Sequence, residues 1–144
     1  MRSVSAKPQN VLKTEMATRL RGAGLRPTRQ RLALGRLLFS QGDRHVTAEA
    51  LHVEAQGSGV ELSLATVYNT LHQFTAAGML RQVTVGGDKA YFDTNVGDHH
   101  HFYIDAEQRL IDIPGDKVEV LGLPSPPAGS QIDRVDVIVR IKAR

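Results

Sequence analysis

The chain has 144 residues, of which 41% are hydrophobic and 23% are charged, and its formal net charge is +3. This length suits one ordinary domain, or two small domains that share an interface or dimerise. The absence of cysteine excludes disulfides, cysteine-bound zinc and thiol catalysis. Neither a long apolar run nor a signal-peptide core is present, so we expect a cytoplasmic protein without a membrane partner.

The charge is distributed unevenly. Residues 1–85 carry a formal charge of +6, whereas residues 86–144 carry −3. A basic first half favours association with nucleic acid, although net charge by itself does not define a fold.

Four helices are expected in the first half. Residues 1–10 lack periodicity and are predicted to form a mobile tail. Apolar residues then recur at helical spacing from Val11 to Ala23, and again after three residues that suit helix N-caps, namely Thr28, Thr47 and Ser63.

The fourth helix has two contrasting faces. Its apolar face carries Leu64, Val67, Leu71 and Phe74. Its other face is small, uncharged and rich in hydrogen-bonding groups: Ala65, Thr66, Tyr68, Asn69, His72 and Gln73. Such side chains suit the DNA major groove, although an ordinary surface face is the alternative. Together with the preceding helix, this segment predicts a helix-turn-helix.

A β-hairpin is predicted directly after these helices. Leu80–Val85 and Ala90–Asp93 are the expected strands, joined by a glycine-containing turn. A helix-turn-helix followed by a hairpin is a winged helix, and Arg81 and Lys89 would place positive charge where the wing meets phosphate.

A second, smaller domain is expected after a polar hinge at residues 94–97. His99–Asp105 and Arg109–Ile113 are predicted to form an antiparallel pair, and Ile132–Ile141 a long alternating strand. Because so thin a sheet has little core, we expect it to dimerise, which would also supply two recognition helices.

The predicted fold class is therefore α+β. Residues 1–93 are predicted to form an N-terminal winged helix-turn-helix domain for DNA binding, and residues 98–144 a small α/β domain for dimerisation and ligand sensing.

Three of the six histidines follow one another at His99, His100 and His101. In a strand, His99 and His101 would share one face, while Asp98 and His100 would share the other. Imidazoles near carboxylates suit iron, manganese and zinc, and imidazole is also an axial ligand of haem. A solvated histidine loop without a ligand is the plain alternative.

Other functions remain open at this point. The His/Asp cluster could serve a metal-dependent hydrolase, although no HExxH, GxSxG or phosphate-loop motif is present. A constitutive winged-helix DNA-binding protein with an inert histidine patch, or a metal buffer, is a further possibility.

Three stretches together resemble the ferric uptake regulator (Fur) family of metal-dependent transcription factors. They are Gly24–Arg31, Leu64–Tyr68 and the histidine cluster after the wing, and the resemblance extends from about Thr14 to Arg140. Asn69, where the family usually carries arginine, and the lack of cysteine make the chain most similar to the iron response regulator (Irr) branch, whose members sense haem.

The resemblance implies two metal sites. The regulatory site of the family, at the junction of its domains, maps to His45, Asp93, His101 and Asp112. A second site maps to Asp98, His100 and Glu119, but the later histidine that completes it in the family has no counterpart here.

The resemblance also bears on cofactors and partners. The cysteines of the family's structural zinc fall on Ile104 and Glu107, so we expect no such zinc. Haem would be delivered by a haem-carrying protein and would bind His99, His100 or His101. It would favour release of a homodimeric repressor from double-stranded operator DNA. The implied DNA-binding residues are Arg26, Arg31, Ser63, Thr66, Tyr68 and Asn69.

Overall fold

The computed structural model describes residues 9–87 and 89–144, and it separates the chain into two compact units, Met1–Val96 and Gly97–Arg144. Residues 1–8, most of the predicted tail, lie outside the described residues. Helix α1 begins at Gln9, so the last two residues of that predicted tail are helical.

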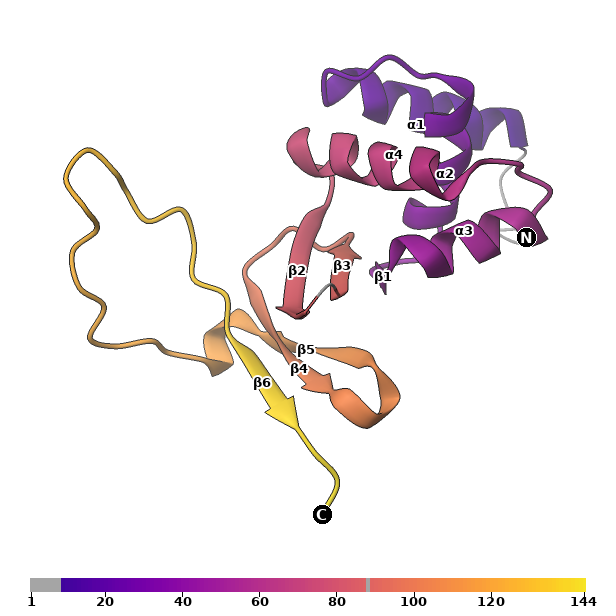
Figure 1. Ribbon diagram of the computed structural model, residues 1–144. Coiled ribbons are helices and arrows are strands. Elements are labelled where there is room, and N and C mark those ends of the chain that lie inside the picture. The colour runs from indigo at the N-terminus through magenta and orange to yellow at the C-terminus, as the bar shows by residue number, and fades with distance from the viewer. Residues whose placement is uncertain (1–8, 88) are drawn as a thin grey trace, which may run out of the picture. The chain divides into compact units, whose positions relative to one another are not determined.

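The described part of the first unit contains four helices and a small sheet (Figure 1). Its helices are α1 (Gln9–Gly22), α2 (Arg29–Phe39), α3 (Ala48–Gly57) and α4 (Leu64–Ala76). The three predicted N-caps are confirmed: the side chains of Thr28, Thr47 and Ser63 each accept a hydrogen bond from the backbone N–H three residues further on. These bonds satisfy donors that a helix start leaves unpaired.

The core of this unit lies between the helices. It is built from residues that are fully or almost fully buried, including Leu20, Leu34, Leu38, Leu51, Val67, Leu71, Phe74 and Phe92. The apolar face of α4 predicted from the sequence is confirmed for Val67, Leu71 and Phe74, whereas Leu64 is 36% exposed.

Strands β1 (His45–Val46), β2 (Arg81–Gly86) and β3 (Lys89–Asp93) form one sheet in the order β1-β3-β2. The predicted hairpin is confirmed as β2 and β3, and we call it the wing. The two-residue strand β1 was not predicted, because two residues show no periodicity. It completes the winged helix by pairing antiparallel with β3.

The second unit is a three-stranded sheet with the order β5-β4-β6 (Figure 1). The predicted antiparallel pair is confirmed as β4 (His99–Ile104) and β5 (Arg109–Pro114), joined through the 3-10 turn Asp105–Glu107. β4 is thus the central strand.

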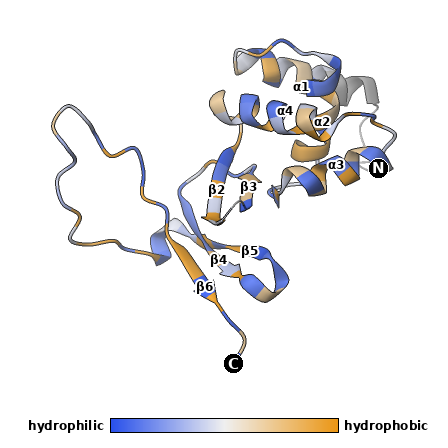
Figure 2. Cartoon of the chain, in the orientation of Figure 1, coloured by the Kyte–Doolittle hydropathy of each residue, from blue (hydrophilic) through white to orange (hydrophobic). Residues whose placement is uncertain are grey.

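The prediction of a strand over Ile132–Ile141 was too long, because only β6 (Ile138–Ile141) is strand. β6 pairs parallel with β4, and a long loop without regular structure connects it to the short turn Gly115–Lys117. The alternation of polar and apolar residues over 132–141 is compatible with a strand, but only the last four residues pair with another strand, β4. Most of β6 is hydrophobic (Figure 2).

Candidate metal centre and DNA-reading helix

His45 and Asp93 form an imidazole–carboxylate pair in the first unit. They are direct register partners in the β1–β3 pair, so their Cβ atoms lie on the same face, about 5 Å apart. Asp93 is fully buried, and its Oδ1 accepts a hydrogen bond from the backbone N–H of Asn95 at 2.9 Å. The unpredicted strand β1 is therefore what brings this pair together.

Arg44, the residue before His45, forms hydrogen bonds with three other residues, Thr94, Glu54 and Leu37. Its backbone N–H donates to Thr94 Oγ1 at 2.9 Å, and its carbonyl accepts from the Thr94 N–H at 3.0 Å. Its guanidinium donates to both carboxylate oxygens of Glu54, at 2.9 and 2.7 Å, and to the Leu37 carbonyl at 3.0 Å. The hydrogen bond from Arg44 lowers the pKa of Glu54. These contacts fix the chain beside both His45 and Asp93.

His101 and Asp112 form a second pair, within the second unit. They are register partners in the β4–β5 pair, and His101 Nε2 lies 3.4 Å from Asp112 Oδ1. His99 Nε2 lies 3.8 Å from the same oxygen, and the His99 and His101 ring centroids are 4.6 Å apart. The shared strand face predicted for these two histidines is therefore observed.

The ring of His99 is oriented by the backbone. Its Nδ1 lies 2.7 Å from the Gly97 carbonyl, so Nδ1–H donates and the lone pair of Nε2 is directed elsewhere. The resemblance did not place His99 in the metal set with His101 and Asp112. The spacing of two residues along a strand was the signal that could have included it.

His100 has a different environment. Its Nδ1 accepts a hydrogen bond from the backbone N–H of Val137 at 3.0 Å, and its side chain is buried. Asp98 packs closely against Gly115, whereas Glu119 is exposed. A site made of Asp98, His100 and Glu119 stays a prediction.

The start of α4 is tied together by hydroxyl groups. Ser63 Oγ accepts from the Thr66 N–H at 3.1 Å and donates to Thr66 Oγ1 at 2.9 Å. Asn69 is exposed on the side of α4 away from the buried Val67, and Thr66 and Tyr68, on the two flanks, are half-buried. Tyr68 also packs against the core. A DNA-reading face made of these side chains stays a prediction.

Tyr68 and Arg31, two further predicted DNA-binding residues, also have protein partners. Tyr68 donates its hydroxyl hydrogen bond to Glu49 Oε2 at 2.9 Å, and this bond raises the pKa of Tyr68. Arg31 donates from Nε and Nη2 to Gln73 Oε1, at 3.2 and 3.1 Å, and from Nη1 to the Arg26 carbonyl at 3.0 Å. Both side chains are thus oriented by contacts within the protein.

Arg81 differs from expectation. It opens β2 as the register partner of Asp93 and is only 6% exposed. It therefore lies at the base of the wing and is not available to a phosphate at the tip. Lys89, beside the turn between β2 and β3, keeps the place that was predicted for a wing cation.

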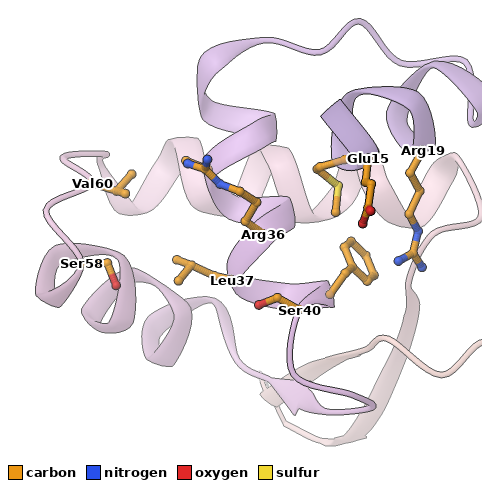
Figure 3. A pocket seen from close by; sticks show the side chains of 10 residues that line it. Glu15, Arg19, Arg36, Leu37, Ser40, Ser58 and Val60 are labelled. Carbon is orange, nitrogen blue, oxygen red and sulfur yellow. The ribbon is translucent and has the colours of Figure 1, made fainter. Parts of the chain in front are cut away.

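A pocket of about 500 Å³ opens between α1, the end of α2 and the end of α3 (Figure 3). Arg19 covers the Phe39 ring there, with its guanidinium carbon 4.1 Å from the ring centroid. Glu15 and Arg36 also line the pocket. Its lining includes neither His45 nor Asp93, so it is separate from the His–Asp pair of the first unit.

A winged helix-turn-helix joined to a small sheet unit defines a class of DNA-binding transcriptional regulators. Residues 22–124 match the family model described as the ferric uptake regulator family. The chain belongs to this family of metal-responsive regulators, and the predicted membership is confirmed. Its relatives are regulators and not enzymes, and none favours the hydrolase alternative.

Several named relatives are similar in sequence. The ferric uptake regulation protein of Pseudomonas fluorescens is 34% identical over 103 residues, which cover 71% of this chain and 84% of that protein. That of Shigella flexneri is 35% identical over 107 residues, covering 74% and 72%. The peroxide-responsive repressor PerR of Staphylococcus aureus is 33% identical over 98 residues, covering 68% and 66%.

Solved structures support the fold. The ferric uptake regulator of Pseudomonas aeruginosa with manganese has a TM-score of 0.66 at 24% identity, covering 90% of this chain and 98% of that one. That of Vibrio cholerae has a TM-score of 0.69 at 24% identity, covering 88% and 98%. The predicted α+β class, with a winged helix before a small α/β domain, is confirmed. No helix in the described residues has the length and apolar character to cross a membrane.

Proposed function

We propose that the protein is a dimeric DNA-binding regulator whose operator affinity is set by a divalent metal ion bound by His45, Asp93, His101 and Asp112. The observation that carries this proposal is that each unit presents its own cross-strand His–Asp pair. Neither pair alone supplies the four ligands that a tight site usually has.

The donor chemistry fits such an ion. Two imidazoles and two carboxylates suit manganese, iron or zinc. His99 is a further donor of this set, since its Nε2 faces the carboxylate of Asp112. A bound ion would supply a positive charge that neutralises the carboxylates and fixes the positions of their strands.

The ion would control DNA binding if its tight binding requires ligands from both units. An ion changes an equilibrium only through its different affinities for the two arrangements of the protein. Couplings of this kind typically amount to 5- to 150-fold in affinity. The anchored Arg44 segment would transmit the position of His45 to α2 and α3.

The DNA-binding surface of the proposal is α4 with its flanking cations. Thr66, Tyr68 and Asn69 would contact base edges, Ser63 would contact the backbone near the helix start, and Arg26, Arg31 and Lys89 would contact phosphate or the minor groove.

Dimerisation through the second unit completes the proposal. β6 is an edge strand of a thin sheet, and Val139 and Ile141 on it are 38% and 37% exposed. An exposed apolar edge of this kind favours pairing with a second copy. A two-fold dimer would present two recognition helices to a palindromic operator.

The test uses a DNA duplex selected from a random pool by the manganese-loaded protein. Its dissociation constant is measured by fluorescence anisotropy with Mn²⁺ and with chelator. We expect Mn²⁺ to tighten binding 5- to 150-fold, and Asp112→Asn to remove most of this gain. Equal dissociation constants in the two conditions would instead identify a constitutive winged-helix protein.

A haem response, as in the Irr branch, is the second candidate. The observation that favours it is the hydrogen bond from His99 Nδ1–H to the Gly97 carbonyl, because it fixes the orientation of a ring that would supply an imidazole ligand to haem iron. His100 and His101 are neighbouring candidates, and a haem-carrying protein would make the delivery. Haem would promote release from the operator, so the repressor would act when iron is scarce.

Haem binding is tested by absorption spectroscopy. A Soret band that shifts on titration and is lost in His99→Ala, with weaker operator binding, would support this candidate. A titration that leaves operator affinity unchanged would contradict it.

A further inference from the structure

His72 lies on α4, one helical turn beyond Tyr68, and its ring contacts two others. The Tyr68 and His72 centroids are 6.2 Å apart with an interplanar angle of 18°, so the rings are stacked. The His72 and Phe92 centroids are 5.5 Å apart at 81°, an edge-to-face contact. His72 therefore joins a residue of the DNA-reading face to a residue of the wing.

Tyr68 is fixed at its other end by α3. Its hydroxyl donates to Glu49 Oε2, and Glu49 lies in the first turn of that helix. With the hydroxyl held by Glu49 and the His72 ring nearly parallel to the phenol ring at 6.2 Å, Tyr68 has neighbours that define its direction on two sides. A change on either side would alter the position that Tyr68 offers to a base.

Phe92 connects His72 to the strands that carry the first His–Asp pair. It is fully buried, it precedes Asp93 on β3, and its register partner on β1 is Val46, which follows His45. A movement of His45 and Asp93 would therefore be passed along the backbone to Val46 and Phe92, which adjoin them on β1 and β3.

The rings of Phe92, His72 and Tyr68 therefore follow one another as neighbours, starting at the residue before Asp93. We infer that His72 is a positioning residue that transmits ligand binding at His45 and Asp93 to the base-reading side chain Tyr68. The inference rests on the proposed function, because it needs a metal-dependent change in operator affinity to transmit.

The exposure of His72 makes the inference testable. Because the side chain is not part of the buried core, its removal should leave the fold intact. Removing one aromatic contact typically changes an equilibrium by about 2- to 10-fold. The expected effect is therefore a smaller Mn²⁺-dependent gain in DNA affinity, at normal Mn²⁺ affinity of the free protein.

The experiment compares wild type, His72→Ala and His72→Phe on the selected duplex, with and without Mn²⁺. Fluorescence anisotropy gives DNA affinity, titration calorimetry gives Mn²⁺ affinity, and circular dichroism gives the folded fraction. We expect His72→Ala to reduce the Mn²⁺-dependent gain about 2- to 10-fold. His72→Phe, which keeps a ring but no ring nitrogen, should retain the gain.

The outcomes separate the alternatives. A full gain in His72→Ala would overturn the inference and leave the proposed function standing. Equal losses with and without Mn²⁺, not restored in His72→Phe, would identify His72 as a direct DNA contact and also overturn it. No gain in the wild type would reject the proposed function, and the inference with it.

Discussion

His45 and Asp93 face each other across β1 and β3, and this arrangement supplies the first unit with half of the proposed metal site. If one ion is bound by residues of both units, Asp93→Asn and Asp112→Asn should each weaken Mn²⁺ binding about tenfold or more. Titration calorimetry on the full chain measures both. Asp116→Asn, an exposed carboxylate in the second unit, is the control and should be neutral. A loss in Asp112→Asn alone would show that the second unit binds the ion without Asp93.

The Arg44–Glu54 pair should make stability depend on pH in the acid range. The hydrogen bond from Arg44 lowers the pKa of Glu54 below its ordinary value of 4.5. A carboxylate with a lowered folded-state pKa stabilises the fold above its ordinary pKa, and this contribution is lost as pH falls through the lowered value.

Urea unfolding of Glu54→Gln checks this prediction. The variant should be less stable than wild type by about 1 kcal/mol at pH 7, since the pair is only partly buried. The difference should shrink as the pH falls below 4.5. A difference that stays constant down to pH 3 would show that Glu54 acts through packing and not through its charge.

Replacement of Arg31 by lysine should weaken operator binding. Three of its five N–H donors bind Gln73 and the Arg26 carbonyl, which leaves two for a DNA phosphate. Arg31→Lys keeps the charge but not the planar fork, so operator affinity should fall while its salt dependence is nearly unchanged.

Arg31→Ala should lower affinity and also reduce the slope of log K against log salt by about 0.9. Anisotropy at several salt concentrations measures both variants. An Arg31→Lys protein with wild-type affinity would show that the contact to Gln73 is unimportant for DNA binding.

Gly115→Ala should destabilise the second unit. A Cβ there would lie 2.7 Å from the Asp98 carbonyl oxygen and 2.8 Å from its Oδ2, and a backbone atom cannot easily move away. We expect a loss of about 1–3 kcal/mol in thermal or urea unfolding. Gly57→Ala, where the added atom meets nothing within 4 Å, is the matched control. It should be neutral or slightly stabilising.

The helices of the first unit could be predicted because their signals are local. Thr28, Thr47 and Ser63 each bond to a backbone N–H three residues away, so the caps can be identified in the sequence. The wing was predictable for the same reason, since its glycine turn and its two strands adjoin.

Long-range partners were harder to predict. The strand at His45 has only two residues and exists because β3 offers an edge to it. The burial of Arg81 likewise depends on its place opposite Asp93, which its type and position in a hairpin could not reveal. The grouping of His99 with Asp112 was within reach, because alternation along β4 already placed His99 beside His101.

The bond between Val137 and His100 has a consequence for the end of the chain. Because Nδ1 of His100 accepts that N–H, a neutral ring carries its proton on Nε2. A metal or haem iron that took Nδ1 would therefore displace this bond, while the His101 N–H would still donate to the Val137 carbonyl. Occupation of His100 through that nitrogen would loosen the start of the outer strand on which a second copy is proposed to pair, so ligation there would weaken assembly.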